Sequence, residues 1–247
     1  THSLEKEISV FKKMKVLGLN VPEILFNSKI FSVPGYDESG IFVKNFRFFL
    51  MTYIEGIAVD KKIQSVSDDE KLFWLKKISG MMVKIHATKG KEYGFIDQYN
   101  NASFKTNTIH GFLNELNSIT KLLEENIGDL FAKRVKIFME DKIKSLSKEF
   151  KSSGYLPQIS LSLFDGSAGN MLIKNRDIQV LDFTCVGYFE PIIDFCAHFF
   201  CMKDILSSEY KGKKFYEYFI DFYKIQGGKL PPEPFLSQLF RIVIVYF

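Results

Sequence analysis

Residues 161–173 read LSLFDGSAGNMLI, and residues 180–183 read VLDF. Asp165 ends an apolar run, and Asn170 follows it five residues later. The glycines between them permit the positive backbone dihedrals of a tight loop. A second carboxylate, Asp182, stands among apolar residues a short distance further along. These two stretches carry the main information about fold and function.

The segments around this loop are typical of short strands. Apolar residues dominate 159–164, 171–173 and 178–183, and the polar run KNRD at 174–177 predicts a hairpin between the last two. Because a hairpin reverses the chain, we expect it to return Asp182 to the Asn170 end of the loop. We therefore predict that one end of the loop brings together the side chains of Asp165, Asn170 and Asp182.

Three converging oxygen-bearing side chains suit phosphoryl transfer from a nucleotide. Mg²⁺ prefers a few hard oxygen ligands and shares its remaining positions with phosphates and water. A separate carboxylate is needed to orient the attacking hydroxyl and to take its proton. A purely structural role for Asp182 would leave a charge in an apolar hairpin, which is costly unless a cation compensates it.

The rest of the chain predicts an α+β protein of 247 residues, with a small β-containing part before a larger helical one. Helical spacing runs over 4–17, and Gly18 and Pro22 end that helix. Aromatic-rich strands are expected at 24–33 and 41–54, with a turn at 34–37 between them. A capping box at 67–70 opens a helix that reaches about His86, and Tyr93-Gly94 follows in a loop. Further helices are expected at about 112–123, 131–150, 191–202 and 208–226, and after 231–234.

Composition excludes several classes of protein. No apolar stretch is long enough to span a membrane, and no secretory signal is present in this sequence. Three cysteines without metal-type spacing fit free thiols in a reducing cytoplasm. The net charge is +4, but only four of the 33 basic residues are arginine and acids lie among the lysines, so we expect no nucleic-acid partner.

The motifs resemble those of the aminoglycoside phosphotransferase and choline kinase family, the small-molecule branch of the protein-kinase-like fold. Glu7 stands fourteen residues before Val-Pro at 21–22, as the family's helix glutamate does. FLMTYIEG at 49–56 is similar to the family's strand and hinge, and Ile-His at 85–86 with Tyr-Gly at 93–94 to its first large-lobe helix. Asp165, Asn170 and Asp182, and Asp194 after Glu-Pro at 190–191, complete the matching motifs.

The resemblance implies a bilobal fold, with a partial nucleotide-binding lobe and hinge at 1–56 and a helical lobe with the catalytic loop at 57–247. It implies that Asp165 is the catalytic residue and that Asn170 and Asp182 bind Mg²⁺. Backbone groups of the hinge would read the purine of ATP or GTP, apolar side chains would pack beneath it, and two acidic residues would support the site. The hinge residues are Thr52 and Ile54, and the apolar residues beneath the purine are Leu172 and Leu181. The supporting acidic residues are Glu7 and Asp194.

The predicted activity is therefore phosphate transfer from ATP or GTP to a hydroxyl of a small molecule, by a cytoplasmic enzyme. An aminoglycoside or another amine-bearing compound is one candidate substrate, and choline or a sugar-like metabolite is another. A regulatory, nucleotide-binding pseudokinase is the alternative, because Leu163 stands where the family has a histidine. The family's glycine hairpin and phosphate-binding lysine precede Glu7, so we expect that the sequence omits these front strands. His86 and His198 are expected to be packed or hydrogen-bonded rather than catalytic.

Overall fold

Helix α1 (Leu4–Val16) begins the chain in the computed structural model, which describes residues 4–28, 31–37, 40–46, 48–96, 137, 141, 145, 148, 152, 158–164, 168–233 and 236. Its buried stripe includes Val10, Phe11 and Met14, which follow the helical period. Gly18, with a φ of 70°, ends the helix as expected, and the Leu19 N–H returns to the Met14 carbonyl at 3.1 Å.

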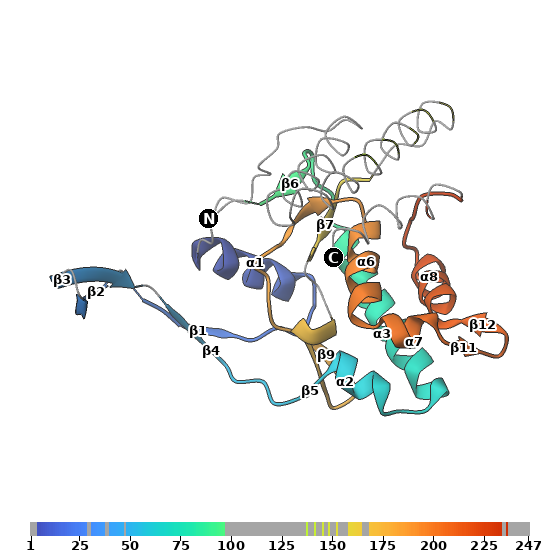
Figure 1. The fold of residues 1–247 in the computed structure, drawn as a ribbon, viewed down its shortest axis with the longest axis horizontal. Helices are drawn as coiled ribbons and strands as arrows, with labels where there is room; N and C mark the ends of the chain where they lie inside the picture. Colours follow the sequence, from blue (N-terminus) through green and yellow to red (C-terminus); the bar gives the residue numbers. More distant parts are fainter. Residues whose placement is uncertain are drawn as a thin grey trace.

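Two antiparallel strand pairs follow α1. Strand β1 (Ile24–Asn27) pairs with β4 (Phe49–Met51), and β2 (Phe31–Asp37) pairs with β3 (Gly40–Phe46). The β2–β3 hairpin projects away from the helical body beyond β1 and β4 (Figure 1). The predicted turn at 34–37 is wrong, because these residues lie within β2 and pairing continues to Asp37 opposite Gly40. Proline and glycine mark a turn only where the ladder does not continue through them.

The body is built around helix α3 (Asp68–His86), which packs along α8 (Phe215–Ile225) and against β7 (Ser160–Ser162). The Ser67 side chain accepts a hydrogen bond from the Glu70 N–H, so the predicted cap is present. Short helix α2 (Val59–Gln64) contacts α3, and α6 (Ile192–Cys201) leads into α7 (Lys203–Ser207), which contacts α8. The core between them consists of large apolar side chains that are almost fully buried, among them Leu75, Ile78, Phe195, Phe215 and Phe219.

Two three-stranded sheets flank the candidate site. In the first, β5 (Ile57–Ala58) pairs with β8 (Met171–Lys174), which pairs with β9 (Asp177–Val180). In the second, β10 (Gly187–Phe189) lies between β7 and β6 (Gly94–Phe95). A single 3₁₀ turn, η1 (Ala168–Asn170), leads into β8. The strands and hairpin predicted between 159 and 183 are confirmed, whereas Gly94 belongs to a strand and not to a loop.

The predicted helix at 208–226 begins seven residues late. Strands β11 (Glu209–Tyr210) and β12 (Lys213–Lys214) form a hairpin before α8, and both of its turn residues have positive φ. That turn is incompatible with a continuing helix. The helices predicted at about 112–123 and 131–150 lie outside the described residues, except for single helical positions between 137 and 152. The last predicted helix lies outside them except at Leu236.

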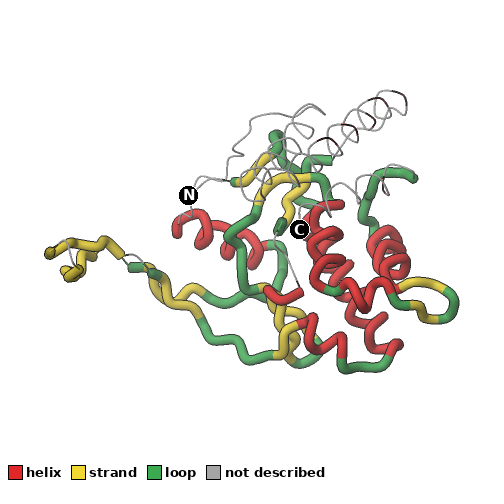
Figure 2. The backbone as a smooth tube through the Cα atoms, viewed as in Figure 1, coloured by secondary structure: helices red, strands yellow, loops and turns green. Residues whose placement is uncertain are grey.

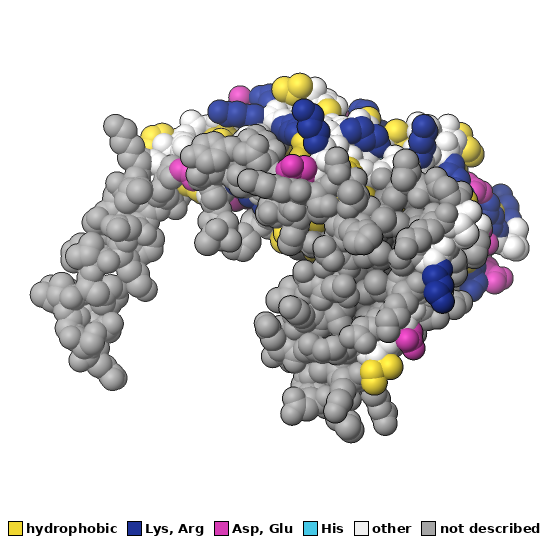
Figure 3. All heavy atoms as spheres, turned by 90° about the horizontal axis from the view of Figure 1, so that it is seen from above, with side chains coloured by type: hydrophobic (Ala, Val, Ile, Leu, Met, Phe, Trp, Pro, Cys, Tyr) yellow, Lys and Arg dark blue, Asp and Glu magenta, His cyan; other side chains and the backbone are white. Residues whose placement is uncertain are grey.

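The described surface is mixed in charge. Lysine and arginine side chains are spread along one rim, with acidic and hydrophobic side chains among them (Figure 3). Within the described ranges, none of the helices combines the length and hydropathy that crossing a bilayer demands. Figure 2 shows most of the helices gathered on one side of the molecule and most of the strands on the other.

Candidate active site

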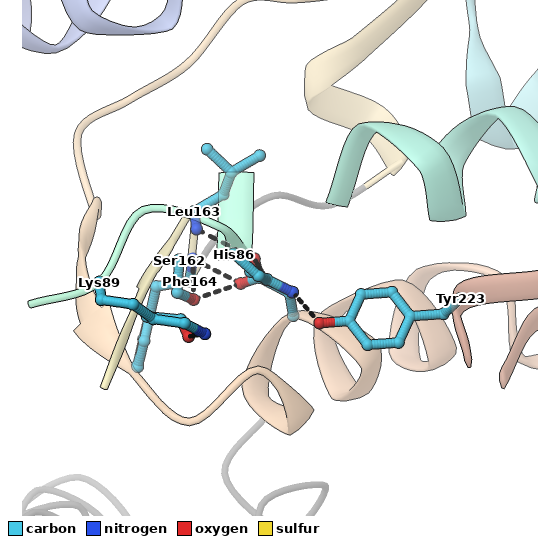
Figure 4. A network of polar contacts seen from close by, with 8 residues as sticks. His86, Lys89, Ser162, Leu163, Phe164 and Tyr223 are labelled. Carbon is cyan, nitrogen blue, oxygen red and sulfur yellow. Dashed lines mark hydrogen bonds and ion pairs between the residues drawn. The ribbon is translucent and has the colours of Figure 1, made fainter. Parts of the chain in front are cut away.

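The buried carboxylate of Asp194, on α6, organises the entry to the loop. Asp194 is 1% exposed and accepts hydrogen bonds from the Ser162 hydroxyl at 2.5 Å, the Phe164 N–H at 2.9 Å and the Leu163 N–H at 3.1 Å. The His86 ring adds a fourth contact, with 3.0 Å between Nε2 and Oδ2 (Figure 4). Burial by itself raises the pKa of Asp194, but the bonds from His86, Ser162 and Leu163 outweigh it and hold that pKa below its ordinary value.

His86 links this carboxylate to α8. Its Nδ1 lies 2.7 Å from the Tyr223 hydroxyl, and both residues are buried. A neutral ring that donates from Nε2 to Asp194 and accepts the Tyr223 hydroxyl proton at Nδ1 satisfies all three groups. The expectation that His86 is packed and hydrogen-bonded is confirmed.

The backbone just before the loop is strained and held in place. Phe164 has a φ of 59°, which is rare for a residue with a side chain. Its N–H is bound by Asp194, and its ring packs against Phe95 and Phe189 with centroids 5.0 and 5.1 Å away. Asp165, the predicted catalytic residue, lies outside the described residues, but the chain that leads to it is fixed by these contacts.

The structure brings Asn170 and Asp182 to the same end of the β8–β9 hairpin. Met171 is opposite Val180 in the register, and the Leu181 N–H donates to the Asn170 carbonyl at 3.0 Å. Asp182 is therefore one residue beyond a position that is bonded to Asn170. Asp182 is half-buried, and its Oδ1 accepts the Thr184 N–H at 2.8 Å and the Thr184 hydroxyl at 2.6 Å. Its Oδ2 receives no hydrogen bond from the residues that the structure describes.

This donor set fits a magnesium ion. A carboxylate oxygen and a side-chain amide oxygen at one hairpin end are hard ligands, and nucleotide phosphates and water supply the others when Mg²⁺ binds in such sites. In the described part of the chain, no three histidine, cysteine, aspartate or glutamate residues cluster as a metal cage would. A site that is completed by the nucleotide remains compatible with that finding.

The residues predicted to bind the nucleotide lie on the β8–β9 hairpin and on the segment 52–56, which passes beside β8. Leu172 and Leu181 are both half-buried and share one face of the hairpin, opposite the buried Met171 and Val180. The segment that follows Thr52 comes close to this face at Gly56, where an added Cβ would lie 2.9 Å from the Cβ of Leu172. Two apolar side chains thus stand beside a closely packed hinge.

The hinge is hydrogen-bonded to the residue that precedes β1. The Thr52 N–H donates to the Glu23 carbonyl at 2.9 Å, and the Thr52 hydroxyl accepts the Glu23 N–H at 2.9 Å. The Thr52 N–H is therefore used within the fold. Ile54 lines a cavity of about 330 Å³ together with Asn175 and Asp177 of the hairpin. Glu7 is half-buried on α1, next to Lys6.

Sequence reasoning missed Ser162, Tyr223 and Thr184. Threonine two residues after an aspartate is the pattern of a local turn in which the carboxylate accepts the N–H two positions on, so Thr184 could have been found. No local signal marks Ser162 or Tyr223, because both act through partners far away in the sequence. His198 is 1% exposed, as expected of a residue inside the core.

The helices and sheets are arranged as in the protein-kinase-like fold, which several solved structures share. Over 98% of this chain and 72% of the other, the structure is similar to the GDP and kanamycin complex of APH(2")-IIia, with a TM-score of 0.61 and 13% identity. Macrolide 2'-phosphotransferase type I gives 0.59 and 14% over 98% and 70% of the two chains. A choline/ethanolamine kinase family protein from Mesorhizobium loti gives 0.54 and 15% over 98% and 64%. Neither the models of known protein families nor the sequences of curated proteins give a match.

Asp194→Asn is expected to lower the free energy of unfolding by about 3 kcal/mol, because an amide NH₂ would then face donors that need an acceptor. The matched control is Asp177→Asn, which weakens an exposed ion pair with Lys77 and should cost at most about 1 kcal/mol. Urea unfolding of both variants measures the difference. Equal losses in the two variants would contradict the central place of Asp194.

The stability of the protein is expected to fall between pH 6.5 and 4 because of His198. Burial lowers the pKa of His198 to about 4. His86 lowers this pKa further, whereas the carboxylate of Asp194 raises it. Within the described residues its Nδ1 has no hydrogen-bond partner. The unfolded chain takes up a proton below about pH 6.5 while the folded chain does not, so stability falls by about 2 kcal/mol from pH 7 to 5.

Urea unfolding at several pH values tests this effect against His198→Leu. The variant should show a flatter dependence over that range, whatever its stability at pH 7. A wild-type slope that persists unchanged in His198→Leu would assign the dependence to other groups.

Proposed function

We propose that this protein transfers the γ-phosphate of ATP or GTP to a hydroxyl group of a small molecule. The observation that carries the proposal is the convergence of Asn170 and Asp182 at one hairpin end, next to a loop whose entry is fixed by Asp194. The nucleotide would lie where residues 1–56 meet residues 57–247, with its purine on Leu172 and Leu181. The carbonyl of Thr52 and the N–H of Ile54 would read the purine edge.

Each residue has a distinct part in the proposed reaction. Asp165 orients the acceptor hydroxyl and takes its proton, while the Asp182 Oδ2 and the Asn170 side chain hold Mg²⁺. When bound, Mg²⁺ would supply positive charge that neutralises the phosphates. Glu7 and Asp194 support this arrangement from α1 and α6. Rate enhancement then comes from positioning and from electrostatic stabilisation.

The geometry at Leu163 favours an active enzyme over a pseudokinase. The Leu163 side chain is 2% exposed, and the residue contributes to the network through its N–H. Every residue except proline offers that N–H, so the loop entry is held without the family's histidine. The replacement therefore leaves intact the contacts that present Asp165.

The solved neighbours guide the choice of substrates for a test. One holds kanamycin with GDP, another holds streptomycin with ATP, and others act on macrolides or belong to the choline/ethanolamine kinase family. Amine-bearing compounds with free hydroxyls are therefore the first class to offer, with both nucleotides as donors. Kanamycin, a macrolide and choline cover the three groups.

Asp165→Ala is expected to lower turnover by about a thousandfold while nucleotide binding is kept, because it removes the proton acceptor. Asp182→Ala should instead weaken binding of the Mg²⁺-nucleotide by more than about tenfold, since a metal ligand is lost. Phosphate transfer and calorimetric nucleotide titration measure the two effects. Asp204→Ala, an exposed aspartate on α7, is the control and should change neither.

Two results would contradict the proposal. Unimpaired turnover of Asp165→Ala would remove that residue from the reaction. Nucleotide binding by the wild-type protein, without transfer to any acceptor, would favour the pseudokinase.

A further inference from the structure

Lys6 is a buried cation at the edge of the candidate metal site. It lies on α1, is 9% exposed, and its Nζ donates to the Thr184 carbonyl at 2.9 Å. The ammonium also stands 5.8 Å from the centre of the Phe95 ring. A side chain near the start of the chain therefore reaches a turn 178 residues away.

Lys6 binds Thr184, and Thr184 in turn binds the Asp182 carboxylate. Thr184 donates both its N–H and its hydroxyl to Asp182 Oδ1, so its carbonyl and its two donors form a continuous path from Lys6 to the carboxylate. With Oδ1 engaged by Thr184, the orientation of Oδ2 depends on how firmly Thr184 is held. Lys6 holds it from α1.

A second contact from α1 reinforces the same turn. Phe183, between Asp182 and Thr184, is fully buried and packs edge-on against Phe11 with ring centroids 4.8 Å apart. The backbone of 182–184 is thus fixed by α1 through one apolar contact and one charged hydrogen bond. A shift of the helix must move the turn.

Stability alone gives a poor account of a buried lysine here. Burial lowers the pKa of Lys6, and Cys185 and Glu7 oppose this lowering, so desolvation of the ammonium is the dominant effect. An apolar side chain of similar length would fill the same space without that cost. The directional hydrogen bond to Thr184 is what an apolar residue cannot supply.

We propose that Lys6 is a positioning residue that sets the orientation of the Asp182 carboxylate and so couples the position of α1 to the affinity for Mg²⁺. The inference rests on the proposed function, since it assigns the metal to Asp182. It adds a cation on α1 whose target is the turn after Asp182. Displacement of α1 would weaken metal binding without a change in any metal ligand.

Lys13 provides a matched control on the same helix. Its Nζ donates to the Tyr188 hydroxyl at 2.7 Å and lies 5.2 Å from the centre of that ring. Lys13 therefore also ties α1 to the body, through a hydrogen bond and an aromatic ring. Its partner Tyr188 lies in β10 and not in the turn at 182–184.

The experiment compares Lys6→Met, Lys6→Arg and Lys13→Met in Mg²⁺ titrations of nucleotide binding, with thermal unfolding of each variant. In Lys6→Met the Mg²⁺ concentration for half-maximal binding should rise about tenfold, the effect of losing one hydrogen bond from a charged group. Lys6→Arg keeps a donor and should recover most of this loss. Lys13→Met should leave the Mg²⁺ requirement unchanged, and the unfolding temperatures show that each variant keeps its fold.

The outcomes separate this inference from the proposed function. Equal Mg²⁺ requirements in Lys6→Met and Lys13→Met, in a wild-type protein that binds the Mg²⁺-nucleotide, would overturn the role of Lys6 alone. A lack of rescue by Lys6→Arg would also overturn it, provided that this variant unfolds at the wild-type temperature. If the wild-type protein binds no Mg²⁺-nucleotide, both proposals fall.

Discussion

One buried carboxylate, that of Asp194, joins the parts of the molecule on which the candidate site depends. Removing a carboxylate from water is costly, and here the cost is offset by donors from two other segments. Ser162 and the two following N–H groups belong to the end of β7, His86 to the end of α3, and Asp194 itself to α6. Because each donor has a fixed direction, the carboxylate sets the mutual position of these three elements and holds Phe164 in its strained conformation.

Strand pairing brings the two predicted metal ligands, Asn170 and Asp182, to one end of a hairpin. The loop enters from β7, which Asp194 fixes, and leaves through η1 into β8, which pairs with β9. The Asn170 end and Asp182 then follow from the hairpin register alone. Contacts from α1, through Lys6 and Phe11, hold the turn beyond Asp182 from the other side. Backbone pairing therefore places the residues of the site, and side-chain contacts then hold them there.

Local patterns predict the parts of this arrangement that local forces create. Two short apolar runs and a polar turn were sufficient to predict the hairpin at 171–180, and that hairpin was sufficient to bring Asn170 and Asp182 to one end. The hydrogen bond between His86 and Asp194 joins residues 108 positions apart, and no spacing rule reveals it. The turn expected at 34–37 failed for the opposite reason, because strand pairing overrode a strong local turn signal. Lys6 reads as an ordinary surface lysine until its burial is seen.

A crystal structure with Mn²⁺ in place of Mg²⁺ and a non-hydrolysable nucleoside triphosphate would show whether a nucleotide-bound metal lies between Asn170 and Asp182. Anomalous scattering locates the metal independently of the refined coordinates. We expect a peak within about 2.5 Å of an Asp182 oxygen and of the Asn170 amide oxygen, in contact with the phosphates. A nucleotide bound with its metal away from both residues would contradict this expectation.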